Sequence, residues 1–282
     1  MQKIKYLPLI PIPAVSIGAM IMYLNDIPKN IWLQNMIVVT LLIILSYLMI
    51  KRKNITPKST AKNYLHILII FLLFVLTFYD SGIDGVHRWI TLGPISLNIA
   101  SLFLPLLLII LGNILSQDHW WRSYMIVLTA SFLMVLQPDA STVTAFVLSS
   151  FVLLIFNMKR QMIRYAVLVI PLIFIVLSWV FIDGLAPVPY VEDILFMAKD
   201  LGTIWFIISL LSLFILIIPF IFFRPVKRKL TSICLGIYFF TLLITTFFGN
   251  FPVILMGYGI SPIIGYFISI NWLLGNKLKD IN

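Results

Sequence analysis

The sequence predicts an all-α, polytopic membrane protein with about ten transmembrane helices and both termini in the cytoplasm. Hydrophobic residues make up 61% of the 282 residues and charged residues only 11%, whereas soluble domains carry about 25% charged residues. Several apolar runs reach about 18 residues, enough to cross a hydrocarbon core of ~30 Å. The net charge of +10 lies mainly in the segments between these runs. This placement indicates contact with membrane lipid and argues against a nucleic-acid partner.

The apolar runs are expected to form the helices of a single transmembrane domain over residues 1–282. In order, they are residues 6–24, 31–50, 64–79, 98–116, 123–138, 141–158, 165–182, 203–223, 230–248 and 260–275. Lys3 and Lys5 precede the first run as in a signal peptide, but no small-x-small cleavage site follows. We therefore expect the first run to be retained as a helix. The single Cys234 excludes a disulfide framework and a cysteine-based metal site.

The charges in the loops predict the orientation of the chain. With a cytoplasmic N-terminus, only Lys29, Arg88 and Lys199 of the 20 Lys and Arg residues fall on the outer side. The inner clusters include Arg52, Lys53, Lys58, Lys159 and Arg160. An excess of Lys and Arg in short loops marks the cytoplasmic face. The carboxylates expected at the outer face are Asp26, Asp80, Asp84, Asp139, Asp183, Glu192, Asp193 and Asp200.

Two outer segments carry most of the polar chemistry. Residues 80–94 interrupt the apolar pattern with Asp80, Asp84, His87, Arg88 and Trp89, and such a cluster is costly unless it meets water. Residues 183–202 begin with a proline-containing loop and turn amphipathic near residue 191. We expect a short surface helix that ends near Gly202. Any chemistry is therefore expected at outer loops and helix ends.

Two short runs at the predicted outer face read as motifs. They are Gly85–Gly93 (Gly-Val-His-Arg-Trp-Ile-Thr-Leu-Gly) and Gln137–Thr142 (Gln-Pro-Asp-Ala-Ser-Thr). They resemble the signatures Gly-Ala-x-Arg-Trp-Ile-x-Leu-Gly and Gln-Pro-Asp-x-Gly-Thr of the SEDS family, the group of FtsW, RodA and SpoVE. A third family element, Gln-Pro-(Ser/Ala)-Glu-x-x-Lys, is degraded here, because Ser101 and Leu104 replace its carboxylate and its ammonium.

Two weaker matches follow in the order of the family. Glu192-Asp193-Ile194-Leu195-Phe196, then Lys199–Gly202, is similar to Thr-Asp-Phe-Ile-Phe followed by Glu-Glu-Leu-Gly. Either Asp193 or its neighbour Glu192 occupies the position of the family's essential acid. Phe251-Pro252 and Tyr258-Gly259-Ile260-Ser261 are similar to the family's Leu-Pro-Phe-x-Ser-Tyr-Gly-Gly-Ser-Ser.

The resemblance implies a peptidoglycan glycosyltransferase that polymerises lipid II at the outer leaflet of the bacterial cytoplasmic membrane, in cell-wall growth, cell shape or division. It implies a catalytic role for Asp193 and a class B penicillin-binding protein as partner. The chemistry also needs a cation against the leaving pyrophosphate, and the candidates are Arg88 and a divalent cation such as Mg or Mn. The remaining candidate substrate-binding residues are Trp89, Asp139, Glu192, Tyr258 and Ser261.

Other interpretations stay open from the sequence. A non-catalytic SEDS-like scaffold or regulator of envelope synthesis would explain the degraded element. An unrelated transporter would need charges at mid-membrane depth, and few are found. Locally, Arg88 and Trp89 also suit an interfacial anchor, Asp139 suits the N-cap of the sixth helix, and Glu192 and Asp193 suit the solvated face of a surface helix.

Overall fold

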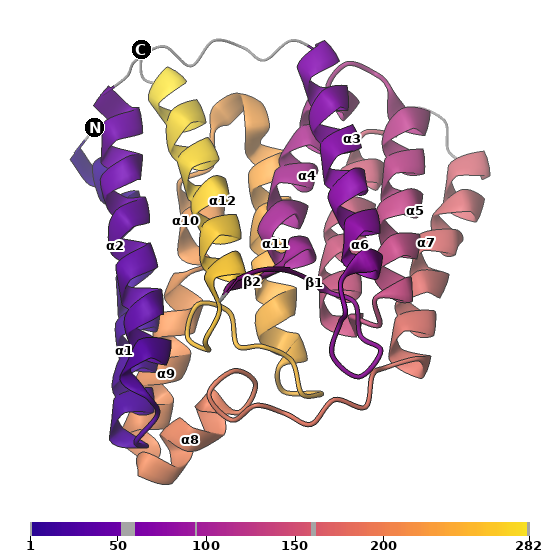
Figure 1. Ribbon diagram of the computed structural model, residues 1–282. Helices are drawn as coiled ribbons and strands as arrows, with labels where there is room; N and C mark the ends of the chain where they lie inside the picture. The colour runs from indigo at the N-terminus through magenta and orange to yellow at the C-terminus, as the bar shows by residue number, and fades with distance from the viewer. Residues whose placement is uncertain (1, 52–59, 94, 159–161, 281–282) are drawn as a thin grey trace. The chain divides into compact units, whose positions relative to one another are not determined.

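The computed structural model describes residues 2–51, 60–93, 95–158 and 162–280 (Figure 1). The chain divides into two compact units, one formed by Met1–Ile55 with Ala186–Asn282 and the other by Thr56–Leu185. The expectation of one domain over residues 1–282 stays a prediction. Pro94 and the residues predicted at the inner face, Arg52, Lys53, Lys58, Lys159 and Arg160, lie outside the described residues.

The first unit combines the two N-terminal helices with the C-terminal third of the chain. Its elements are η1 (Gln2–Leu9), α1 (Ile12–Leu24), α2 (Lys29–Lys51), α8 (Ile194–Leu201), α9 (Thr203–Ile215), α10 (Ile218–Phe222), η3 (Val226–Arg228), α11 (Lys229–Thr245) and α12 (Ile260–Lys279). Helix α2 packs against α1 and α12, and α9 packs against α1 and α8. Helix α8 ends where Gly202 takes a φ of 135°, which a side chain would disfavour. It is the surface helix that the sequence predicts.

The second unit is a helix bundle with a small hairpin. Its elements are α3 (Thr60–Leu76), η2 (Thr77–Tyr79), β1 (Trp89–Leu92), β2 (Ile95–Asn98), α4 (Ile99–Leu115), α5 (Trp120–Leu136), α6 (Ala140–Phe156) and α7 (Met162–Val180). Helix α4 packs against α3, α5 and α6, and α6 also packs against α7. Most residues of α4 and α6 are buried, so these two helices form the core of the unit.

The predicted polytopic membrane fold is confirmed. Every apolar run coincides with a described helix, and residues 203–223 form the pair α9 and α10. Within the described chain, five helical segments are long and apolar enough to cross a bilayer: Ile4–Leu24, Lys29–Ile50, Lys62–Tyr79, Thr203–Phe222 and Val226–Thr245. Shorter apolar helices cover Ile99–Leu115, Trp120–Leu136, Ala140–Phe156 and Ala166–Val180. The protein is therefore a multi-pass membrane protein.

The hairpin is a feature that the sequence analysis does not predict. Strands β1 and β2 pair antiparallel with Trp89 opposite Asn98 and Leu92 opposite Ile95. The β-branched and aromatic residues of Trp89–Leu92 favour a strand, and Gly93 turns the chain with a φ of 61°. Helix α4 then starts at Ile99, where the Asn98 side chain accepts a hydrogen bond from the Ser101 N–H at 2.8 Å.

Basic side chains gather at one end of each unit. In the first unit, the Asp280 carboxylate accepts from the Val226 N–H at 2.7 Å, and the Lys277 ammonium donates to the Arg224 carbonyl at 3.0 Å. Figure 1 shows the end of α12 here and α8 at the opposite end of the unit. In the second unit, Arg122 donates to the Tyr64 hydroxyl at 3.2 Å. The separation of charge within each unit agrees with the predicted orientation.

Candidate functional site

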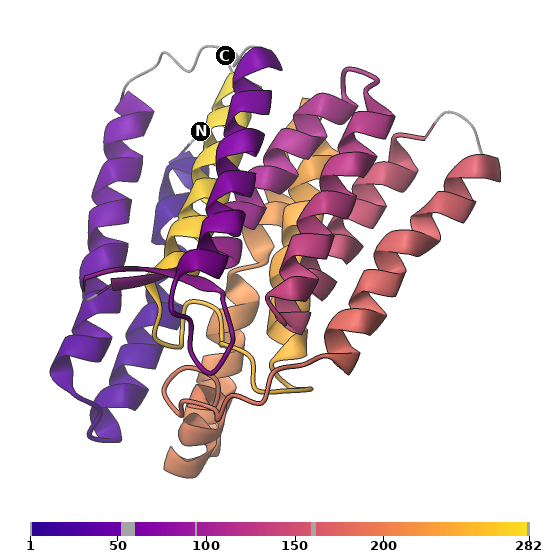
Figure 2. The same cartoon turned by 45° about the vertical axis from the view of Figure 1, so that its right-hand side comes forward.

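Arg88 joins the two best-matched motifs of the sequence. Its Nε donates to the Gln137 carbonyl at 3.0 Å, and its Nη2 donates to the Pro138 carbonyl and to the Asp183 carboxylate. The Arg88 and Asp183 side chains are only 8% and 12% exposed. The Arg-Trp and Gln-Pro-Asp motifs, about 50 residues apart, therefore meet at one end of the second unit, where the loop after α3 also lies (Figure 2).

The turn between α5 and α6 is built from buried polar side chains. Gln137 is fully buried, and its amide donates to the Thr77 hydroxyl at 2.7 Å. The Asp139 carboxylate accepts from the Thr142 N–H at 3.2 Å, so Asp139 is the N-cap of α6. The capping interpretation of Asp139 is thus confirmed, and a role toward a substrate stays a prediction.

Trp89 begins the hairpin beside this cluster. The Arg88 guanidinium carbon lies 6.0 Å from the centre of the Trp89 ring, at the limit of a cation–π contact. The hairpin is tied to the end of α3 by Asp80, whose carboxylate accepts from the Thr91 N–H at 2.8 Å and from the Gly82 N–H at 3.3 Å. These backbone hydrogen bonds lower the pKa of Asp80. A charged carboxylate therefore helps to fix the strand that carries Trp89.

Asp193 and Glu192 differ in what their carboxylates do. Glu192 accepts a hydrogen bond from the Val188 N–H at 2.7 Å and closes the loop before α8. Asp193 is the N-cap residue of α8, and its carbonyl accepts from the Phe196 and Met197 N–H groups at 2.8 Å and 2.9 Å. Among the described residues, the half-buried Asp193 carboxylate has no hydrogen bond or ion pair. The two acids therefore differ in their hydrogen bonding, and a catalytic role for Asp193 stays a prediction.

The segment before Asp193 is paired with the loop 249–259 in the first unit. The Tyr258 N–H donates to the Tyr190 carbonyl at 2.9 Å, and the Val253 N–H donates to the Val191 carbonyl at 3.0 Å. The Tyr258 hydroxyl donates to the Gln34 amide oxygen at 2.9 Å, and burial raises its pKa. Ser261 lies in the first turn of α12 and is 2% exposed. The structure thus brings Tyr258 close to the acidic segment as a support for its backbone.

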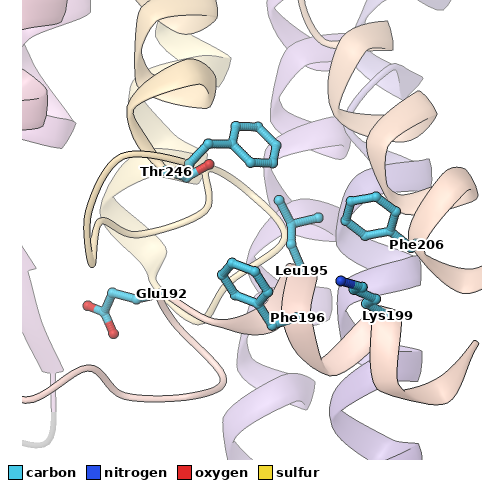
Figure 3. Close-up of a pocket in the computed structure, with 7 residues that line it drawn as sticks. Glu192, Leu195, Phe196, Lys199, Phe206 and Thr246 are labelled. Carbon is cyan, nitrogen blue, oxygen red and sulfur yellow. The ribbon is translucent and has the colours of Figure 1, made fainter. Parts of the chain in front are cut away.

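A small crevice is lined in part by Glu192 (Figure 3). Its volume is about 120 Å³, and its walls come from Leu195, Phe196, Phe206, Thr246 and Phe247, with Glu192 and Lys199 also lining it. In Figure 3 the Glu192 carboxylate points away from the aromatic side chains. Lys199 has no ion pair within the described part of the chain. Apolar walls beside an ammonium group suit a lipid with an anionic head better than a sugar.

The predicted site residues therefore fall into two clusters, one in each unit. Arg88, Trp89 and Asp139 lie together in the second unit, and Glu192, Asp193 and Tyr258 lie together in the first, with Ser261 three residues after Tyr258. In the described ranges, no three His, Cys, Asp or Glu residues converge on a point that would hold a metal ion.

Asp183, Gln34 and Asn35 belong to these clusters but are not predicted as site residues from the sequence. The sequence indicates Asp183 only as one of the outer carboxylates, because nothing in it identifies the partner of this residue. Gln34 and Asn35 did leave a signal, since two adjacent amides interrupt the apolar run 31–50. Buried amides in a membrane helix require partners.

Comparison with solved structures finds a similar fold in the rod shape determining protein RodA from Thermus thermophilus, in two crystal structures among those that match. The TM-score is 0.71 to a point mutant of that protein and 0.70 to the unmutated protein. Each match has 16% identity and covers 98% of this chain and 97% of RodA. The chain has the RodA fold. No family profile matches this RodA-like protein, and no curated protein sequence does. The resemblance to the SEDS family is confirmed at the level of the fold.

Proposed function

We propose that this RodA-like protein is a peptidoglycan glycosyltransferase that polymerises lipid II at the outer leaflet of the bacterial cytoplasmic membrane. The observation that carries the proposal is a RodA fold over 98% of the chain, within which the Arg-Trp and Gln-Pro-Asp segments contact each other through Arg88. The Asp193 carboxylate, without a partner in the described residues, supports it further. The proposal places the protein in cell-wall growth.

In the proposed reaction, one lipid-linked sugar is the donor and a second lipid-linked sugar supplies the acceptor hydroxyl. The acceptor oxygen attacks the anomeric carbon of the donor, and a glycosidic C–O bond forms. The bond between that carbon and the pyrophosphate oxygen breaks, and the polyprenyl pyrophosphate leaves with the electron pair. Asp193 takes the hydroxyl proton as general base. Its position at the start of the surface helix α8 suits a substrate whose sugars lie at the membrane surface.

A cation must offset the charge of the leaving pyrophosphate. Arg88 is the residue that the sequence predicts, but three of its hydrogen bonds go to Asp183 and two carbonyls. Lys199 lies on α8 with Asp193 at its start, and it has no ion pair in the described chain. We therefore assign Lys199 to the pyrophosphate, with Arg88 holding the motif segments in place. The crevice beside Lys199 would receive the first part of the polyprenyl chain.

Binding of a divalent cation stays a prediction from the sequence. The residues that the structure describes include no cluster of three metal-ligating side chains, and the outer carboxylates Asp80, Asp139 and Glu192 already accept hydrogen bonds from backbone N–H groups. No step of the proposed reaction is therefore assigned to a metal ion.

A second candidate function is a non-catalytic scaffold of envelope synthesis. The Arg88–Asp183 ion pair favours it, because this guanidinium is neutralised within its own unit. Both functions are compatible with a class B penicillin-binding protein as partner, as the family resemblance implies. They differ in whether the protein itself extends glycan strands.

The test is lipid II polymerisation by the purified protein in lipid nanodiscs, with and without a class B penicillin-binding protein. We expect glycan strands from the unmutated protein and a rate lowered by about 100-fold or more in Asp193→Asn, the usual contribution of a general base. Asp200→Asn is the matched control, since Asp200 is an exposed carboxylate on the same helix, and it should stay within about twofold of the unmutated rate. Product formation by Asp193→Asn at the unmutated rate would contradict the assignment of the base. No product from any variant, with normal growth in cells, would favour the scaffold.

A further inference from the structure

Asn35 lies in α2, far in sequence from the candidate site, and is 2% exposed. Its amide nitrogen donates to the Gly257 carbonyl at 3.0 Å, and its amide oxygen accepts from the Gly259 N–H at 3.3 Å. Both polar groups of the side chain are therefore used to hold the backbone of the loop 249–259. A buried amide in a membrane helix is costly unless it is hydrogen-bonded. The two hydrogen bonds to the loop therefore explain why an amide can be buried at position 35.

The same loop holds the segment that leads into Asp193. Val253 and Tyr258 donate to the carbonyls of Val191 and Tyr190, and Val191 is two residues before Asp193. The approach is close, since a Cβ atom added at Gly257 would lie 2.4 Å from the Val191 carbonyl oxygen. A continuous set of contacts therefore runs from Asn35 through Gly257 and Gly259 to the backbone beside Asp193. All of these residues belong to the first unit.

We propose that Asn35 is a positioning residue, which acts through the loop 249–259 to hold the backbone of residues 190–193 and thereby orients the Asp193 carboxylate. The inference rests on the proposed function for its effect on catalysis, but the clamp itself is a property of the fold. Catalytic groups must be held close to their productive geometry, and a small displacement of a base lowers the rate without weakening substrate binding.

The physical reason for an amide at position 35 is its pair of opposite hydrogen-bonding groups. The loop presents a carbonyl at Gly257 and an N–H at Gly259 to α2, and only a side chain with both a donor and an acceptor satisfies the two together. Leucine has a similar size but leaves both loop groups unsatisfied in a buried site. The loss of a buried hydrogen-bond partner raises the population of locally opened states.

The first measurement is amide hydrogen exchange of the full-length protein in nanodiscs. In Asn35→Leu we expect exchange to rise by about tenfold or more at the amides of residues 253–259 and 190–193. Ser46→Ala is the matched control, because Ser46 is also fully buried in α2 but bonds only to the Leu42 carbonyl of its own helix. Unchanged exchange in both segments of Asn35→Leu would overturn the clamp.

The second measurement is the rate of lipid II polymerisation for the same proteins. Asn35→Leu should lower kcat by about tenfold or more with KM within about twofold, as expected when a base is misplaced but the substrate still binds. Faster exchange with an unchanged kcat would overturn the positioning role. If neither the unmutated protein nor the variant makes product while exchange still rises, the proposed function fails and the clamp stands.

A second variant reaches the same contact from the loop side, in case Asn35→Leu does not fold. Gly257→Ala places a methyl group against the Val191 carbonyl and should raise exchange at residues 190–193 in the same way. Gly184→Ala is its control, because a Cβ atom there meets nothing within 4 Å. Equal exchange in the two glycine variants would overturn the inference.

Discussion

At the scale of single residues, the ion pair of Arg88 and Asp183 connects separate segments of the second unit at one of its ends. The two residues are 95 positions apart, and the guanidinium also binds the carbonyls of Gln137 and Pro138. Taking two charges out of water is costly, and a buried pair repays that cost only when its hydrogen bonds are complete. Arg88 meets this condition better than lysine would, because its planar group reaches three acceptors at once.

The pair predicts a large stability loss when one partner is removed. Asp183→Leu or Arg88→Met alone should lower the free energy of unfolding by about 3–5 kcal/mol, because each leaves an unpaired buried charge. For a chain of this size we expect Tm to fall by roughly 5–15 °C. The measurement is thermal unfolding of the purified protein in detergent.

A double variant, compared with the two single variants in a double-mutant cycle, tests whether the two residues interact. Arg88→Met with Asp183→Leu should cost clearly less than the sum of the single changes, since no charge is then left alone. Asp200→Leu, at an exposed carboxylate, should change stability by less than about 0.5 kcal/mol. Additive losses in the cycle would mean that the two residues act independently.

The sequence predicts which single residues are unusual but not which residues they bind. The identity of Arg88 as a special residue could be predicted, because a guanidinium among apolar runs needs a partner. The partner itself could not, since eight outer carboxylates offered the same chemistry and only the fold selects Asp183 for this role. In the same way, Glu192 and Asp193 are equivalent in the sequence, and only the structure shows that the Glu192 carboxylate accepts from the Val188 N–H; which acid is catalytic stays a prediction.

At the scale of elements, the charged carboxylate of Asp80 ties the hairpin of β1 and β2 to the end of α3. Asp80 accepts hydrogen bonds from Thr91 in β1 and from Gly82 in the preceding loop. A two-stranded hairpin is marginally stable alone, so it depends on such contacts. The helices were predictable because apolar runs of membrane length have few alternatives. The hairpin was not, because strands of four residues leave too short a pattern in a chain that is apolar nearly throughout.

The Asp80 carboxylate predicts a pH-dependent hairpin. Backbone N–H groups of Thr91 and Gly82 lower the pKa of Asp80 below its ordinary value of 3.8. Its contribution to stability is therefore complete above the ordinary pKa and is lost as the pH falls through the lowered value in the folded state. We expect amide exchange in residues 89–98, corrected for intrinsic rates, to rise between pH 5 and pH 2.5.

Two variants test whether Asp80, and not another acid, causes the pH dependence of the hairpin. Asp80→Asn should expose the hairpin amides already at pH 5 and remove the further change on acidification. Asp84→Asn, at an exposed acid of the same loop, should keep the unmutated pH profile. A hairpin that responds to acid equally in Asp80→Asn would assign the effect to another group.

At the scale of the whole molecule, each unit has basic residues at one end and its acidic cluster at the other. Lys277 near the end of α12 and Arg224 before η3 lie at one end of the first unit, and the loop 249–259 and α8 lie at the other (Figure 1). In the second unit, Lys62 and Arg122 belong to the ends of α3 and α5 that lie opposite the Arg88 cluster. Because loop Lys and Arg residues stay in the cytoplasm, the acidic clusters of both units are predicted to face outward.

Labelling of single cysteines tests this polarity with one outer and one inner position in each unit. The native Cys234 is fully buried and gives little background. Ser81→Cys and Asp200→Cys, both at exposed outer positions, should react with a membrane-impermeant maleimide in intact cells. Lys62→Cys and Lys227→Cys, both exposed at the basic ends, should react only after the membrane is permeabilised. Labelling of all four from outside, or of the inner pair alone, would contradict the orientation that the loop charges predict. Such a result would also mean that Asp193 does not face the outer leaflet, where the proposed reaction takes place.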